Sequence, residues 1–498
     1  MGVDAIPVSV EVDVSSGGLP GVTMVGLPDA TVRESRERVR TAIRNAGFPF
    51  PGSRVTVSLA PADVRKVGAA FDLPIAMGIL AASGVLPYRE PQGYVVVGGV
   101  SLDGGIPPMR GLLPIAVAAR SSPAGLMFPT GNLQEAGIVD GLRLFPVGSL
   151  MEAARVLSAA APRPALPPAT LESSGPMAGD DLADVRGQLL GRRALEIAAA
   201  GAHHLLFSGP PGAGKTMLAR RLPGLLPAPT FDEALAITAI HSVAGLLAPG
   251  CGLIRTRPFR APHHTCSDVA LVGGGSAPRP GELSLAHCGV LFLDELPEFS
   301  RRVLETLRQP LEQGIVHIAR AARSVTFPAR VMLVGAMNPC PCGFAGSATR
   351  TCRCPPGAVD RYQRRLSGPL QDRFDLSVPL PAVPWRDIRS TTSSESTREV
   401  RARVEAARAR QLERQQSLNG TLEGRALQRF CRPADNATER LLEQGVVKLG
   451  LSVRGVARVL RVARTVADLE GSPPLEVRHV AEALQFRLPD AAVVAAKM

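Results

Sequence analysis

The 498-residue sequence predicts an α/β fold with a parallel-sheet core and flanking helices, an α+β domain before the core and a helical domain after it. Three observations predict this order. A glycine-rich run ending in Gly-Lys-Thr lies between an apolar strand and a helix near the middle of the chain. Strand and helix patterns alternate over the first third. Residues 400–498 are rich in Arg, Ala, Leu and Glu, which favour helix.

Residues 1–158 are the first predicted domain. Val8–Val14 alternates apolar and polar residues, which predicts a strand. Pro28 and Asp29 open a helix predicted over Ala30–Ala46. Arg54–Leu59 is predicted as a further strand. We expect these elements to form one α+β domain.

Composition divides the rest of the chain. Residues 159–179 form a linker rich in Pro, Ala and Ser. Residues 180–380 contain the glycine-rich run and form the predicted core. Residues 381–399 are a second connector, and residues 400–498 form a predicted helical lid domain.

The glycine-rich run matches the phosphate-binding loop G-x-x-x-x-G-K-[ST]. It follows the apolar residues 205–207 and precedes a helical pattern over 217–222, which is the context that the motif requires. Its glycines let backbone N–H groups point at phosphate oxygens at a helix N-terminus. We expect Lys215 to reach the β- and γ-phosphates of ATP and Thr216 to hold Mg²⁺. The nucleotide-binding residues are Gly209, Pro210, Pro211, Gly212, Ala213, Gly214, Lys215 and Thr216.

Two more apolar runs end in polar residues. Gly289–Leu293 is followed by Asp294 and Glu295. We expect Asp294 to support Mg²⁺ and Glu295 to polarise the attacking water. Residues 330–337 lead to Asn338, which would orient that water, or alternatively only cap its strand.

Two sets of arginines are candidates for contact with the phosphates. Arg373 lies near a predicted helix end, where it would stabilise the transferring phosphoryl group from a neighbouring subunit. The alternative for Arg373 is an ion pair with a flanking aspartate, Asp372 or Asp375. A second set lies in the lid domain on one predicted helix face, where one arginine could reach the nucleotide or all could form a solvated or DNA-facing stripe. This set is Arg454, Arg458 and Arg461.

Four cysteines are clustered as two C-x-C pairs with nine residues between the pairs. They are Cys340, Cys342, Cys352 and Cys354. Four thiolates suit a tetrahedral structural zinc site, although common fingers use C-x₂₋₄-C spacing. Free thiols and a disulfide or redox role are the alternatives. Four thiolates leave no open position on the metal, so we expect no catalysis there.

The charge predicts an anionic partner. The net charge is +12 and the pI is about 10.0, which favours nucleic acid, although scattered solvated arginines would give the same sum. One Trp and three Tyr offer little for base stacking, so phosphate contacts should dominate DNA binding.

No targeting pattern is visible at the start of the sequence. Met1–Asp4 carries no basic segment, and no run of 18 apolar residues follows. We therefore expect a cytoplasmic protein that does not enter membranes.

The ordered motifs resemble those of the magnesium-chelatase-like branch of the AAA+ ATPases, and in particular the ComM/YifB family. This resemblance covers nearly the whole chain. It implies a homo-oligomer, a hexameric ring with ATP at subunit interfaces, in which Arg373 is the trans arginine finger and Arg454 the second sensor. Known members act on DNA, as helicases that drive branch migration during natural transformation. We therefore expect single-stranded or branched DNA as the partner of this chain. Besides the phosphate-binding loop, the segments that carry it are Asp184–Gln188, Arg193–Gly201, Phe259–Thr265, Pro280–His287 and Asn338–Gly343.

Two smaller features acquire a meaning from the same resemblance. Gly314–Pro328 reads as a β-hairpin similar to the pre-sensor hairpin, which faces the pore in related rings. Arg320 and Arg323 at its tip are DNA-phosphate candidates or, alternatively, solvated turn residues. We interpret the adjacent pair His263-His264 as part of the family's insertion in the ATPase core. Metal ligation is the alternative, although adjacent side chains on a regular element point apart and do not easily share one ion.

The first domain resembles Lon-type proteases without their catalytic dyad. The nucleophile position in Pro61–Ala76 holds Ala69 or Ala70, and the Lys position in Leu102–Pro114 holds Arg110 or a neighbour. Arg does not deprotonate, so Ser-Lys chemistry is impossible and we expect no peptidase activity. The sequence thus favours a DNA motor over a chelatase-type motor that remodels a protein, and both over a protease.

Overall fold

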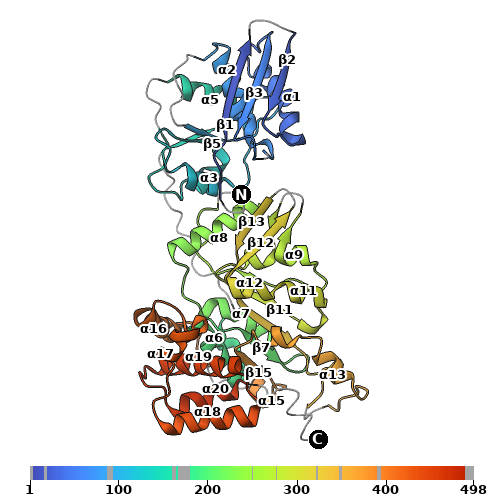
Figure 1. Cartoon of the computed structure of the whole chain (residues 1–498), viewed down its shortest axis with the longest axis vertical. Coiled ribbons are helices and arrows are strands. Elements are labelled where there is room, and N and C mark those ends of the chain that lie inside the picture. The colour runs from blue at the N-terminus through green and yellow to red at the C-terminus, as the bar shows by residue number, and fades with distance from the viewer. Residues whose placement is uncertain are drawn as a thin grey trace. The chain divides into compact units, whose positions relative to one another are not determined.

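The computed structural model of the protein divides into two compact units, which are described separately (Figure 1). The first unit is residues 1–173 together with 234–254, and the second is 174–233 together with 255–498. The structure describes residues 4–15, 19–64, 66–86, 94–159, 164–165, 180–248, 251–275, 278–320, 323–346, 350–389 and 394–487.

The first unit contains two three-stranded sheets. In one, the central strand β3 pairs antiparallel with β1 and parallel with β2. In the other, β5 lies between β4 and β6, and both pairs are parallel. The elements are β1 (Ser9–Ser15), β2 (Gly21–Val25), α1 (Ala30–Asn45), β3 (Arg54–Ala60), η1 (Ala69–Phe71), α2 (Asp72–Ala82), β4 (Tyr94–Val96), α3 (Leu112–Ala119), β5 (Gly125–Pro129), η2 (Thr130–Asn132), α4 (Leu133–Ala136), β6 (Leu144–Val147) and α5 (Leu150–Ser158).

Local sequence explains these elements. Asp29 caps α1 by accepting a hydrogen bond from the backbone N–H of Val32 at 2.8 Å. Every second residue of β3 is buried, so its apolar face joins the core that α1 and α2 cover. The predicted strands at residues 8–14 and 54–59 and the predicted helix at 30–46 are confirmed.

Residues 234–254 pack with the first unit, although they lie within the range predicted for the core domain. The Ser242 hydroxyl donates a hydrogen bond to the buried Glu135 carboxylate. A side chain at Gly245 would meet Arg110 at 2.6 Å, so these residues are also in close contact. The chain therefore leaves the second unit within α8 (Phe231–Ala244) and returns after Ile254. The five-part division of the chain stays a prediction.

The second unit is built on a five-stranded parallel sheet in the order β15-β7-β14-β11-β8. Its central strands β11 and β14 are buried at every position, as is typical of parallel strands covered on both faces. The carboxyl ends of these strands share one edge, so residues that follow them are brought together. The strands are β7 (Leu205–Ser208), β8 (Phe259–Arg260), β11 (Val290–Leu293), β14 (Met332–Met337) and β15 (Leu376–Pro379).

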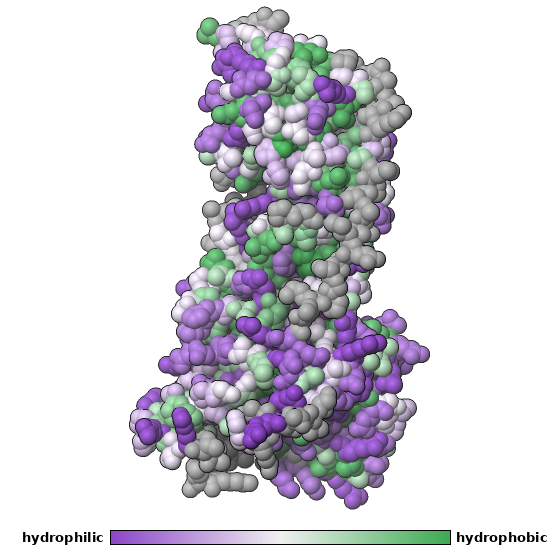
Figure 2. Space-filling model, turned by 180° about the vertical axis from the view of Figure 1, so that it is seen from behind, coloured by the Kyte–Doolittle hydropathy of each residue, from purple (hydrophilic) through white to green (hydrophobic). Residues whose placement is uncertain are grey.

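Helices surround this sheet, and the C-terminal helices share its apolar core. The helices are η3 (Leu182–Asp184), α6 (Leu189–Gly201), α7 (Lys215–Leu225), α9 (Asp268–Val272), α10 (Glu282–Leu285), η4 (Leu296–Glu298), α11 (Arg301–Thr306), α12 (Arg308–Gln313), α13 (Ala358–Gln363), α14 (Gly368–Gln371), α15 (Trp385–Arg389), α16 (Thr397–Gln415), η5 (Asn419–Thr421), α17 (Gly424–Phe430), α18 (Asn436–Leu449), α19 (Val453–Glu470) and α20 (Val477–Gln485). The predicted connector at 381–399 thus contains α15 and the start of α16, where Ser396 and Glu399 form a capping box. On the side of the molecule that Figure 2 shows, most of the surface of the C-terminal helices is hydrophilic.

The predicted hairpin is present as β12 (Ile315–Arg320) and β13 (Arg323–Pro328), which pair antiparallel. The backbones of Arg320 and Arg323 face each other at its end, and their side chains lie outside the described residues. A second two-stranded sheet joins β9 (Gly273–Gly274) and β10 (Arg279–Pro280). In the part of the chain that is described, no helix combines the length and the apolarity needed to cross a bilayer.

Candidate active site

The phosphate-binding loop connects β7 to α7 as predicted. Gly212 and Gly214 have φ values of 77° and 88°, a left-handed backbone that glycine adopts without strain. A side chain at Gly209 would meet the Leu380 carbonyl at 2.3 Å, so the loop lies directly against the end of β15. The loop therefore presents the N-terminus of the 11-residue helix α7 at the sheet edge, where phosphate groups bind favourably.

Lys215 is held at the centre of this loop. Its Nζ donates to the carbonyls of Gly209 at 2.6 Å and Pro210 at 3.0 Å, and to Asn338 Oδ1 at 3.0 Å. The residue is only 9% exposed. Burial lowers the pKa of Lys215, while the nearby carboxylates of Asp294 and Glu295 act in the opposite direction. The site therefore holds a desolvated cation whose neutral partners a phosphate could replace.

Thr216 and Asp294 meet beside the lysine. The Thr216 hydroxyl donates to Asp294 Oδ2 at 2.7 Å, and Asp294 Oδ1 accepts from the backbone N–H of Glu295 at 2.9 Å. A hydroxyl and a carboxylate are hard oxygen donors of the kind that Mg²⁺ prefers. This donor set fits a Mg²⁺ ion next to the nucleotide phosphates.

Glu295 contacts a residue that sequence reasoning did not place in the site. Its Oε2 lies 3.2 Å from His264 Nδ1. The His264 ring packs between two other rings. The centre of the His263 ring lies 4.2 Å from its centre, and the centre of the Phe299 ring, which meets it edge-on, lies 6.4 Å away. The parallel pairing of β8 with β11 produces this contact, because His264 follows β8 and Glu295 follows β11, and no sequence motif indicates that pairing.

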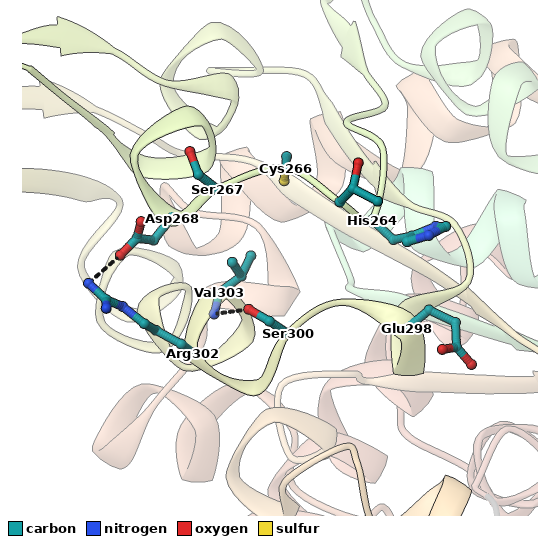
Figure 3. Close-up of a pocket in the computed structure, with 9 residues that line it drawn as sticks. His264, Cys266, Ser267, Asp268, Glu298, Ser300, Arg302 and Val303 are labelled. Carbon is teal, nitrogen blue, oxygen red and sulfur yellow. Dashed lines mark hydrogen bonds and ion pairs between the residues drawn. The ribbon is translucent and has the colours of Figure 1, made fainter.

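His264 also lines a cavity of about 430 Å³ (Figure 3). His264 and Glu298 lie at one end of it, and the ion pair of Arg302 with Asp268, 2.8 Å apart, lies at the other. Between them is Cys266, and burial raises the pKa of its thiol. The cavity is therefore bordered by the residue that contacts Glu295. Its lining is His264, Thr265, Cys266, Ser267, Asp268, Glu298, Ser300, Arg302 and Val303.

Asn338 follows β14 and joins the site through Lys215. Its backbone N–H is hydrogen-bonded to Tyr362, a buried residue of α13, and burial raises the pKa of this tyrosine to about 12. Gln363 Nε2, also on α13, donates to the carbonyl of Pro339 at 3.2 Å. Helix α13 thus fixes the segment that carries Asn338.

Arg373 and Arg454 lie apart from these residues. Arg373 forms an ion pair with Glu312, not with the flanking aspartates that the sequence offered as alternatives. Burial lowers the pKa of Arg373, and the charge of Arg454 lowers it further. Among the described residues, neither side chain is hydrogen-bonded to Lys215, Thr216 or Asp294.

Arg458 and Arg461, the other two arginines on this predicted helix face, bond to the segment that leads into β15. Arg458 is 3% exposed and donates to Asp372 Oδ1 at 2.6 Å. Arg461 donates to Asp375 Oδ1 at 3.3 Å. Arg454 is exposed on the same helix, α19.

The four clustered cysteines come together as a candidate metal centre. Their sulfur atoms lie within 4.8 Å of one another, with 3.3 Å between Cys340 and Cys342 and 3.6 Å between Cys342 and Cys352. Tetrahedral zinc with Zn–S bonds of about 2.3 Å would place its sulfurs about 3.8 Å apart. The donor set, which includes Cys354, therefore fits zinc.

Comparison of the sequence with known proteins identifies the family of this chain. Three family models of the magnesium-chelatase subunit ChlI match in order: "Subunit ChlI of Mg-chelatase" over residues 10–132, "Magnesium chelatase, subunit ChlI" over 181–388, and "Magnesium chelatase, subunit ChlI C-terminal" over 394–487. The protein YifB of Salmonella typhimurium is 45% identical over 493 residues, which cover 98% of this chain and 96% of YifB. The chain belongs to the ComM/YifB family. The competence protein ComM of Haemophilus influenzae is likewise 45% identical over 492 residues, with 98% and 96% of the two chains covered.

A more distant relative marks the wider group. The magnesium-chelatase 38 kDa subunit of Acidiphilium rubrum is 25% identical over 297 residues, or 55% of this chain and 79% of that subunit. The ComM/YifB chain described here is therefore a magnesium-chelatase-like AAA+ protein, and this family implies ATP and Mg²⁺ as its ligands.

Proposed function

We propose that this protein is a hexameric ATP-driven motor that acts on DNA, as a helicase that promotes branch migration in recombination and natural transformation. The observation that carries the proposal is the set Lys215, Thr216, Asp294, Glu295 and Asn338, assembled at one sheet edge. The family of this protein includes a relative named as a competence protein, and the net charge of +12 on the chain favours a nucleic-acid partner.

Each residue of the set has a chemical task. Lys215 exchanges its carbonyl partners for the β- and γ-phosphates of ATP. Thr216 and Asp294 would hold Mg²⁺, which when bound neutralises charge on the phosphates. Glu295 accepts a proton from the attacking water, and Asn338 orients that water. The His264 contact holds Glu295 until water and nucleotide are in place.

The ring follows from the arginines. Among the described residues, neither Arg373 nor Arg454 is hydrogen-bonded to Lys215, Thr216 or Asp294 of its own chain. Guanidinium groups stabilise a transferring phosphoryl group only when they touch it. A second copy of the chain supplies this contact, with Arg373 as the trans arginine finger and Arg454 as the second sensor. ATP then lies between subunits.

The cysteine cluster is a structural zinc site in this proposal. Cys340, Cys342, Cys352 and Cys354 would hold the ion and shape the loop that follows Asn338. The first unit is not a peptidase, because η1 carries Ala69 and Ala70 where a Ser-Lys enzyme needs its nucleophile. It serves in assembly or DNA engagement, and Arg320 and Arg323 of the hairpin contact DNA phosphates. The protein acts in the cytoplasm.

A branch-migration assay tests the proposal. The full chain is mixed with a labelled four-way junction, a forked duplex, ATP and Mg²⁺, and strand products are followed by gel. The proposal expects ATP-dependent products from wild type and none from Lys215→Ala or Glu295→Gln. ATP hydrolysis by wild type with no product from any DNA, across a range of salt concentrations, would refute the DNA role.

The second candidate is a chelatase-type motor that remodels a protein partner. The match to ChlI models favours it. The same site would then turn over ATP without response to DNA, and addition of the partner protein would raise the rate.

A further inference from the structure

The loop after β14 carries an unusually basic surface. Residues 339–366 contain five arginines and one aspartate. Arg365 forms an ion pair with Glu298 at 2.7 Å. The other four are exposed, and among the described residues none has a carboxylate within ion-pair distance. We call these four the knuckle arginines: Arg350, Arg353, Arg361 and Arg364.

The cysteine cluster orders two of the knuckle arginines. The backbone N–H of Arg353 is hydrogen-bonded to Cys342, as is that of Phe344. The guanidinium of Arg350 lies over the Phe344 ring, 5.2 Å from its centre. Both arginines are therefore close to the cysteine cluster: Arg353 lies between Cys352 and Cys354, and Arg350 packs on the ring of Phe344.

The other two lie at α13: Arg361 is within the helix and Arg364 is its C-cap residue. Arg361 and Arg364 are three residues apart, which places them on one face of the helical turn. Between them, Tyr362 and Gln363 bond to the backbone of Asn338 and Pro339. The charged face is thereby anchored to the segment that carries Asn338.

The same loop touches the phosphate-binding loop. Gly343 has a φ of 84°, and a Cβ there would lie 2.5 Å from Pro211 Cδ. Asn338, two residues before the first cysteine, bonds to Lys215 at 3.0 Å. A ligand bound on the knuckle arginines could thus shift two residues of the nucleotide site, Pro211 through Gly343 and Lys215 through Asn338.

We infer that the knuckle arginines bind DNA backbone phosphates and that their occupancy controls ATP turnover through Gly343 and Asn338. Guanidinium groups suit phosphates because they present several N–H donors and keep their charge. The inference rests on the proposed DNA motor and assigns it a contact surface distinct from the β12–β13 hairpin.

The test uses the full-length double variant Arg361→Gln/Arg364→Gln. Anisotropy of a labelled single strand and of a four-way junction gives Kd at several salt concentrations. Each lost phosphate contact should weaken binding about fivefold for the single strand and about eightfold for the junction near 0.1 M salt, and lower the salt slope by about 0.7–0.9. The kcat and KM for ATP without DNA should not change, and DNA stimulation should fall. The matched control is Arg425→Gln/Arg440→Gln, which removes two exposed lid arginines.

Several outcomes separate the inference from the proposed function. Unchanged DNA affinity and salt slope in the double variant, with wild type still stimulated by DNA, would overturn the inference and leave the motor intact. A raised KM for ATP without DNA would also overturn it, because the arginines would then serve the nucleotide. Wild type that binds no DNA would refute the proposed function itself. Arg353→Gln provides an independent variant if the double variant does not fold.

The coupling has its own variant. Gly343→Ala should bind DNA as wild type does, yet lose DNA stimulation, because the added methyl group displaces Pro211. Full stimulation in this variant would overturn the proposed link to the nucleotide site.

Discussion

Each unit of the protein has a polar cluster around a buried charge, and the two clusters differ in how their partners are arranged. In the first unit, Asp72 is fully buried and accepts hydrogen bonds from Arg38 at 2.7 and 3.0 Å and from the Ser35 hydroxyl. The backbone N–H of Val100 completes the set at 3.4 Å. Donors surround both carboxylate oxygens, so this cluster is closed.

The Lys215 cluster of the second unit is open. Its partners include two loop carbonyls and Asn338, and these lie at a sheet edge where strands end. A phosphate can replace such partners without breaking the core. A buried charge whose partners all lie within the core, as at Asp72, stabilises the fold, whereas a buried charge at the edge of a parallel sheet, as at Lys215, is placed to serve chemistry.

Glu295→Gln should have the largest effect in the open cluster. An amide cannot accept the proton from water, so ATP hydrolysis should fall about 10²–10⁴-fold while ATP still binds. Steady-state turnover and binding of a fluorescent ATP analogue measure the two effects. Hydrolysis at the wild-type rate would remove Glu295 from its role.

Lys215→Ala should lower turnover by about 10²–10³-fold, because the charge that faces the phosphates is lost. Circular dichroism should show the fold intact. The matched control is Lys66→Met in the first unit, since Lys66 is also buried and, among the described residues, its Nζ bonds only to the Pro61 carbonyl. That control should lose stability and keep its turnover per folded molecule, and equal loss of turnover in both variants would erase the contrast between the clusters.

Asp72→Asn should act on stability alone. It leaves the part-buried Arg38 without its counter-charge, which should cost about 2–3 kcal/mol of unfolding free energy in the first unit. Urea denaturation measures the cost. Turnover by the folded fraction should not change, and a stable variant with impaired turnover would show that the closed cluster also serves function.

A buried histidine should make the second unit sensitive to acid. Burial, and then the charge of Arg330, lower the pKa of His287 to about 4. The unfolded chain, with a histidine pKa of about 6.5, binds more protons between these values, so stability falls as pH decreases from about 6.5 to 4. From pH 7 to 5 this should cost about 2 kcal/mol. His287→Gln should flatten that part of the pH–stability curve, and an identical curve would contradict the assignment.

The sequence predicted the open cluster better than its surroundings. Strands that end in Asp294 and Asn338 meet the phosphate-binding loop because parallel strands share an edge, which motif order reveals. The contact of His264 with Glu295 depends on which strand neighbours β11, and motif order is silent on strand order. Helical periodicity placed three lid arginines on one face, but it could not show that Arg458 is buried while Arg454 is exposed.

The most direct test of the account is the rate of ATP hydrolysis by wild type with no DNA, a single strand, a duplex and a four-way junction, each at two salt concentrations. The account predicts stimulation by DNA that fades as salt rises, because phosphate contacts release counterions. Hydrolysis that ignores every DNA at both salt concentrations would contradict it and point to a motor that remodels a protein.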